Sequence, residues 1–225
     1  MTSIYQRALG RDFQKLHPQI QRRFGFSSEE RVVAIGRGTM QRVWHGGAHL
    51  RPFLQLGATR HIMFPESGLE VPFQVRNYAY RDSFGRETVT WIREFRFSPM
   101  RRFDAYMVYS RKRNCIIDYL GTHQHLAVEL QLSVDDRGGL RIRSGAQRFF
   151  EGLAGFRFPL LLSGVADVCE WFDDSRGCYA IDVAVRNRIF GPLFGYGGTF
   201  EVEWATVGHR QAPADVMPLR EEFRE

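Results

Sequence analysis

Short alternating segments follow one another at roughly ten-residue intervals from residue 71 onward, and turn residues separate them. The clearest pair is residues 125–134 and 140–149, which flank the acidic, glycine-rich turn Asp135-Asp136-Arg137-Gly138-Gly139. Each segment alternates apolar and polar side chains, as strands with one buried face do. Regular spacing of this kind is typical of an antiparallel sheet that curls or closes on itself. The sequence therefore predicts a mainly β fold.

The remaining segments complete this architecture. A helix is expected over residues 4–24, bent near His17 because Pro18 lies inside it, and a short second helix over residues 49–56. We predict one α+β domain over residues 1–208, with about ten antiparallel strands, and a flexible charged tail over residues 209–225. The first choice is a closed or nearly closed barrel that resembles the lipocalin class. The alternative is a helix-grip, START-like sheet. Both folds are suited to holding a small apolar molecule.

The segment Thr88–Phe95 carries the most informative polar residue. One face of this strand holds Val89, Trp91, Arg93 and Phe95, which is apolar apart from the arginine. A guanidinium that faces a core is costly unless it meets a carboxylate or a ligand anion. Arg93 therefore either binds the acidic group of a ligand, with Trp91 beside it, or forms a structural ion pair. The possible structural partners are Asp167, Glu170, Asp182 and Glu201.

Two carboxylates and a tyrosine are further candidates for a site. Asp167 and Asp182 each share a strand face with apolar residues, and a carboxylate in an apolar cavity can act as a general acid or base. Tyr196 lies among three glycines, so it either presents its hydroxyl to a pocket or plugs a tight turn. We take Asp167 and Asp182 as candidate catalytic residues and Tyr196 as a candidate ligand contact.

His123, His125 and Glu129 share the parity of one strand face, a set that can bind a metal. The neighbouring apolar residues alternate with them, which favours a solvated polar face instead. We keep both histidines as candidate ligand contacts and expect neither a metal nor a cofactor.

Composition restricts the class and location of the protein. Hydrophobic residues form 44% of the 225 residues and include 19 Phe, which argues against global disorder. No apolar run is long enough to span a membrane, and no signal pattern begins the chain, so a cytoplasmic location is expected. The three cysteines have no metal-type spacing, and we expect reduced thiols.

The formal net charge of +6 comes almost entirely from arginine, since Lys15 and Lys112 are the two lysines. The arginines are spread along the chain and many alternate with acids. Nucleic-acid binders concentrate basic residues on one face, so no nucleic-acid partner is expected.

Several short motifs occur in an order that resembles a known family. They are Ile4-Tyr5-Gln6-Arg7-Ala8-Leu9-Gly10, Gly36-Arg37-Gly38, Trp91-x-Arg93-x-Phe95, Phe158-Pro159-Leu160 and Gly191-Pro192-Leu193-Phe194-Gly195-Tyr196-x-Gly198. The chain resembles, over residues 3–204, an uncharacterised bacterial family that is one of the numbered domains of unknown function. The resemblance implies occurrence also at the C-terminus of YndJ-type membrane proteins. It implies no reaction, cofactor or catalytic residue.

Three functions are compatible with these features. The first is binding of a small lipophilic or aromatic molecule with an anionic group, held by Arg93 inside the barrel. The second is a cofactor-independent isomerase, cyclase or lyase that uses a buried carboxylate. The third is a structural or partner-binding domain whose core is filled by phenylalanine side chains.

Overall fold

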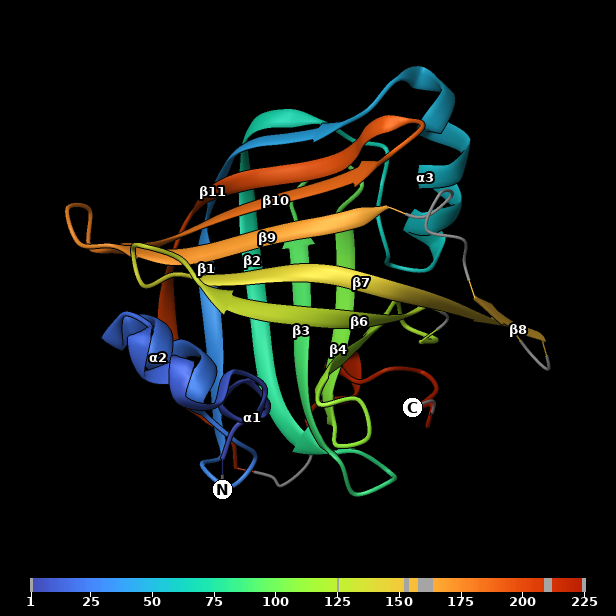
Figure 1. The fold of residues 1–225 in the computed structure, drawn as a ribbon. Helices are drawn as coiled ribbons and strands as arrows, with labels where there is room; N and C mark the ends of the chain where they lie inside the picture. The colour runs from blue at the N-terminus through green and yellow to red at the C-terminus, as the bar shows by residue number, and fades with distance from the viewer. Residues whose placement is uncertain (1, 125, 152–153, 158–163, 209–211, 224–225) are drawn as a thin grey trace.

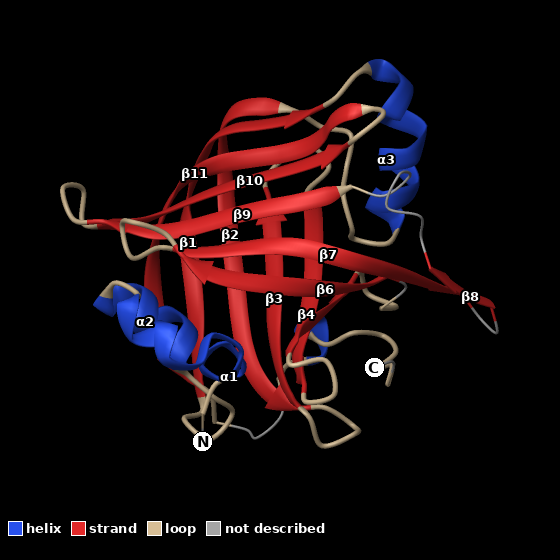
Figure 2. Cartoon of the chain, in the orientation of Figure 1, coloured by secondary structure: helices blue, strands red, loops and turns tan. Residues whose placement is uncertain are grey.

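The computed structural model describes residues 2–124, 126–151, 154–157, 164–208 and 212–223, with side chains omitted at 149–151 and 154–157. His125 and the motif at 158–160 therefore lie outside the described residues. The chain forms a single large sheet with short helices at its ends (Figures 1 and 2). The strands are β1 (Val32–His45), β2 (Gly68–Arg81), β3 (Glu87–Phe95), β4 (Arg101–Ser110), β5 (Cys115–Leu120), β6 (Leu126–Val134), β7 (Leu140–Glu151), β8 (Ala154–Arg157), β9 (Val165–Asp173), β10 (Cys178–Asn187) and β11 (Gly191–Thr206).

The sheet closes into a barrel. Strand order is β6-β5-β4-β3-β2-β1-β11-β10-β9-β7-β8, and an additional β6–β7 pairing joins the two sides. All pairings are antiparallel, and β8 extends from β7 as a short hairpin outside the ring of ten strands. The predicted closed antiparallel barrel is confirmed.

The strands alternate between the barrel interior and its outer surface, as their sequences predict. On β3, Val89, Trp91 and Phe95 join the main interior core, whereas Ile92 belongs to a separate cluster on the outer face. The interior of this half of the barrel is rich in aromatic rings in mutual contact. They include Phe73, Phe95, Phe103, Phe194, Tyr196 and Phe200.

Glycines in β1 allow these rings to pack. A Cβ atom at Gly36 would lie 2.7 Å from the Val75 Cγ1 atom and 2.8 Å from the Phe200 Cδ2 atom. The Gly36-Arg37-Gly38 motif thus leaves interior space for the Phe200 ring.

We expect Gly36→Ala to lower the free energy of unfolding by about 1–3 kcal/mol, because the added methyl overpacks the interior. Urea unfolding monitored by circular dichroism measures this change. Gly208→Ala is the control, since a Cβ atom there meets nothing within 4 Å. Equal stability of the two variants would show that the interior can adjust around Gly36.

The N-terminal helices lie at one end of the barrel (Figure 1). They are α1 (Ile4–Leu9), the 3₁₀ helix η1 (Gly10–Lys15) and α2 (Pro18–Gly25). Ser3 begins α1 with a capping box, and Pro18 occupies the first turn of α2. The interruption before Pro18 agrees with the predicted bend. Ile4, Ile20 and Phe24 are buried against the interior core, so these helices close this end.

The opposite end carries η2 (Ala48–Leu50) and α3 (Arg51–Thr59), close to the predicted second helix. Leu54 is buried beneath α3, while Phe53 and Leu56 are exposed. The connections β1–β2, β3–β4 and β10–β11 all lie at this end because neighbouring strands are antiparallel.

The C-terminal segment, residues 212–223, lies against the outer face of the barrel. Val216 is fully buried and joins the outer cluster that contains Tyr80 and Ile92. Asp215 forms an ion pair with Arg76, with 2.6 Å between the Oδ2 and Nη1 atoms. A loose tail therefore does not describe these residues. The short apolar side chains in this segment cover an outer sheet face that the alternation alone would leave exposed.

Candidate functional site

Arg93 lies in the barrel interior and is 5% exposed. Its Nε atom donates to the Phe103 carbonyl oxygen at 3.1 Å, and its Nη1 atom donates to the Tyr196 hydroxyl at 3.2 Å. The guanidinium also lies 3.8 Å from the centroid of the Phe103 ring. Within the described residues, Arg93 forms no salt bridge with a carboxylate. The interior therefore contains a guanidinium held by a carbonyl, a hydroxyl and a ring.

Tyr5 and Trp91 form a second polar group in the interior. The Trp91 Nε1 atom donates to the Tyr5 hydroxyl at 2.9 Å, and that hydroxyl donates to the Met107 Sδ atom at 3.2 Å. Burial raises the pKa of Tyr5, and the hydrogen bond from Trp91 opposes the shift. Helix α1 thus inserts a neutral hydroxyl among strands β3 and β4.

Asp118 on β5 is an interior carboxylate that the sequence analysis did not select. It lies opposite Met107 on β4 and Val128 on β6, which both belong to the interior core. Its Oδ1 atom is buried and has no hydrogen-bond partner. Burial raises the pKa of Asp118 to about 7, and the positive charge of Arg93 opposes this rise. A proton donor on a ligand would satisfy the unpaired oxygen.

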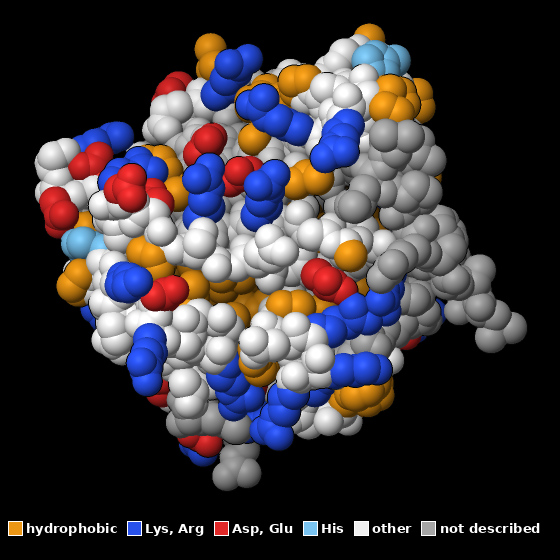
Figure 3. Space-filling model, viewed as in Figure 1, with side chains coloured by type: hydrophobic (Ala, Val, Ile, Leu, Met, Phe, Trp, Pro, Cys, Tyr) orange, Lys and Arg blue, Asp and Glu red, His pale blue; other side chains and the backbone are white. Residues whose placement is uncertain are grey.

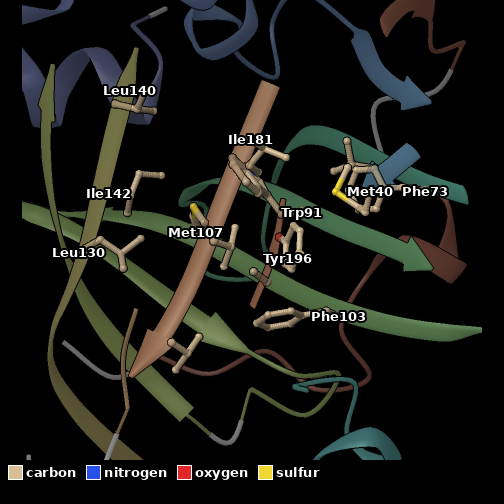
Figure 4. Close-up of a cluster of buried hydrophobic side chains, with 14 of the residues drawn as sticks. Met40, Phe73, Trp91, Phe103, Met107, Leu130, Leu140, Ile142, Ile181 and Tyr196 are labelled. Atoms are coloured by element: carbon tan, nitrogen blue, oxygen red, sulfur yellow. The ribbon is translucent and has the colours of Figure 1, made fainter. Parts of the chain in front are cut away.

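One residue on the inner wall at β9 is only partly buried. Val168 lies opposite Val183 on β10 and Ile142 on β7. Those two neighbours are buried, yet Val168 is only partly buried. Figure 4 shows Leu130 and Ile142 on one wall, facing across the interior toward Trp91, Phe103 and Tyr196. The interior is thus apolar and holds the Arg93 guanidinium and the Asp118 carboxyl.

Asp167 and Asp182 do not line this interior. Asp182 is exposed, and the Asp167 side chain, 42% exposed, pairs with Arg141 at 3.1 Å between the Oδ1 and Nε atoms. Both belong to the outer surface, since Val168, Glu170 and Phe172 carry the inward parity of β9. The interpretation of both carboxylates as interior acids is therefore wrong. Trp171, which shares the strand face of Asp167, stacks outside the barrel against Arg137.

These outward residues border a groove on the barrel wall. It has a volume of about 560 Å³ and crosses β9, β10 and β11. Opposite charges alternate around it, and Arg137 is bonded to Asp135 at 2.8 Å between the Nη2 and Oδ2 atoms. The groove lies on the outer side of the wall and is separate from Arg93.

The other proposed partners of Arg93 are also engaged elsewhere or exposed. Glu170 points inward but bonds to Arg23 of α2, at 2.8 Å between the Oε1 and Nε atoms. Glu201 is exposed on β11. The structural ion pair considered for Arg93 is therefore not formed with these acids.

The histidine pair does not form a site in the described structure. His123 lies in the turn before β6, near Thr122, and His125 lies outside the described residues. Glu129 points outward and bonds to Arg113. In the described part of the chain, no group of three His, Cys, Asp or Glu side chains is arranged to hold a metal ion. All three cysteines are free thiols.

Comparison with known proteins establishes the family. Residues 16–200 match a family described as "Domain of unknown function (DUF4166)". The chain belongs to this family. It is also 35% identical over 206 residues to the "Uncharacterized protein YndH" of Bacillus subtilis (strain 168), covering 90% of this chain and 98% of that protein. No solved structure matches the chain. Among the described residues, no helix is both long and apolar enough to cross a membrane.

Proposed function

We propose that the protein binds a small lipophilic or aromatic molecule with an anionic group inside the barrel. The observation that carries this proposal is Arg93, a buried cation without a carboxylate partner among the described residues. A ligand anion would supply the missing charge through charge-assisted hydrogen bonds. The aromatic rings around Arg93 would contact the apolar part of the ligand. This binding would take place in the cytoplasm, where the three thiols stay reduced.

A pair of fluorescent probes tests the proposal. Anilinonaphthalene sulfonate carries an aromatic body and an anion, and phenylnaphthylamine has a similar body without the charge. We expect Arg93→Met to weaken sulfonate binding by roughly ten- to a hundred-fold, the effect of losing a hydrogen bond to a charged group. Affinity for the neutral probe should change by less than about three-fold. Fluorescence titration measures both.

Arg137→Met is the matched control, because Arg137 stacks on Trp171 in the outer groove at 4.1 Å from the ring centroid. It makes the same chemical change next to an aromatic ring outside the barrel. Loss of sulfonate binding in Arg137→Met, with unchanged binding in Arg93→Met, would assign the probe to the groove and contradict the proposal.

A cofactor-independent acid–base enzyme is the second candidate. Asp118 favours it, because its pKa of about 7 suits proton transfer near neutral pH. An enzyme of this kind would keep ligand binding and lose turnover in Asp118→Asn. The implied occurrence of this domain in YndJ-type membrane proteins stays a prediction of the resemblance.

A further inference from the structure

Exposed hydrophobic side chains gather at the α3 end of the barrel. Nine large hydrophobic residues are exposed in the described part of the chain, and six lie at this end. They are Phe53 and Leu56 on α3, Leu69 at the start of β2, Met100 before β4, and Ile189 and Phe190 between β10 and β11. The opposite end has Phe84 and Phe223, which contact each other. The asymmetry marks the α3 end as an interaction surface.

The hydrophobic residues come from segments that lie side by side. The His49 ring lies 6.4 Å from the Phe190 ring, which links the β10–β11 turn to the start of α3. Residues from α3 and from the β3–β4 connection line one pocket of about 350 Å³, among them Arg51, Gln55 and Phe97. Figure 3 shows hydrophobic side chains over α3 at the top of the view, with basic side chains beside them.

The charge around these side chains is positive. Arg51, Arg96, Arg186 and Arg188 are exposed at this end and form no ion pair within the described residues. The acid Glu66 is paired with Arg101, at 2.5 Å between the Oε1 and Nη2 atoms. The described residues of the β1–β2, β3–β4 and β10–β11 connections hold no other acid, and Glu70 near the start of β2 is exposed. Hydrophobic side chains rimmed by unpaired arginines match the interface of a bilayer that contains anionic lipids.

We propose that the α3 end of the barrel docks on the surface of an anionic membrane. Phe53, Leu56 and Phe190 enter the headgroup region, and the unpaired arginines contact lipid phosphates. The docking surface consists of exposed residues outside the barrel interior, so this proposal does not depend on which ligand the interior binds. No chain segment spans the bilayer in this arrangement.

Vesicle flotation of the full chain tests this proposal. We expect the protein to float with vesicles of phosphatidylcholine mixed with phosphatidylglycerol and not with phosphatidylcholine alone, and added salt should release it. Arg186→Gln/Arg188→Gln should lower the partition coefficient by roughly thirty-fold, since each arginine near such a surface contributes about five-fold. Phe53→Ser/Leu56→Ser should abolish flotation.

Two control variants lie at the opposite end of the barrel. Phe84→Ser removes an exposed aromatic residue, and Arg11→Gln/Arg111→Gln removes the same net charge as the arginine double variant. Both should float like the wild type. Failure to float with any vesicle, or equal losses in test and control variants, would overturn the proposal. The proposal would also be overturned if the protein bound no vesicles and sedimented as a dimer that Phe53→Ser/Leu56→Ser dissociates. That result would assign the surface to self-association.

Discussion

Arg23→Met should lower the free energy of unfolding by about 3–5 kcal/mol, because it leaves Glu170 as a buried carboxylate without its cation. Both side chains are 1% exposed. The Arg23 Nη1 atom also donates to the Asn77 Oδ1 atom at 2.6 Å, so one arginine joins α2 to strands β2 and β9. Burial raises the pKa of Glu170 even with Arg23 present. Urea unfolding at neutral pH measures the loss.

Two comparisons identify the ion pair as the cause. Arg37→Met breaks an exposed pair with Glu203 and should cost less than about 1 kcal/mol. The double variant Arg23→Met/Glu170→Leu should recover much of the stability, since it leaves no unpaired charge. If Arg23→Met lowers the free energy of unfolding no more than Arg37→Met does, the ion pair between α2 and β9 contributes little to stability.

The second large effect is a dependence of stability on pH through Asp118. Its pKa rises from the ordinary value of 3.8 to about 7 in the folded protein. Between these values the folded state holds a proton that the unfolded state has lost, so the free energy of unfolding falls as pH rises. Each pH unit removes about 1.4 kcal/mol, which amounts to about 3 kcal/mol between about pH 5 and about pH 8. Above the folded pKa the loss is complete.

Asp118→Asn removes this titration. Between about pH 5 and about pH 8, its free energy of unfolding should change by about 3 kcal/mol less than that of the wild type. Urea unfolding at these two pH values measures the difference. Asp182→Asn is the control, since it makes the same carboxyl-to-amide change at an exposed position on the outer surface. Identical profiles for the wild type and Asp118→Asn would show that Asp118 is ionised throughout.

The sequence predicts the barrel well because its signals are local. Alternation with a period of two places Trp91 and Arg93 inside, and turn residues set the antiparallel order. Which face of the other strands points inward depends on their register in the sheet. Asp167 lies on β9, which has acidic side chains on both faces, so the alternation there could not tell which face was interior. On β10 the apolar face of Ile181 and Val183 is the interior one, and Asp182 lies on the other face.

The interior position of Asp118 and the packing of the N-terminal helices on the barrel end depend on contacts between residues that are distant in the sequence. Asp118 shares the parity of Ile116 and Leu120, and this single acid on an apolar face was the available signal. Arg23 and Glu170 are 147 residues apart, and no local pattern connects them. The C-terminal segment has little periodicity of its own, because the apolar face that holds Val216 is supplied by the barrel.

The central claim is that Arg93 holds a ligand anion inside the barrel, and native mass spectrometry of the purified protein tests it most directly. We expect a stoichiometric acidic small molecule on the wild-type protein, released by denaturing extraction. It should be absent from Arg93→Leu at unchanged fold by circular dichroism. A wild-type protein with no bound molecule, together with an Arg93→Leu variant that fails to fold, would instead make Arg93 a structural residue and contradict the claim.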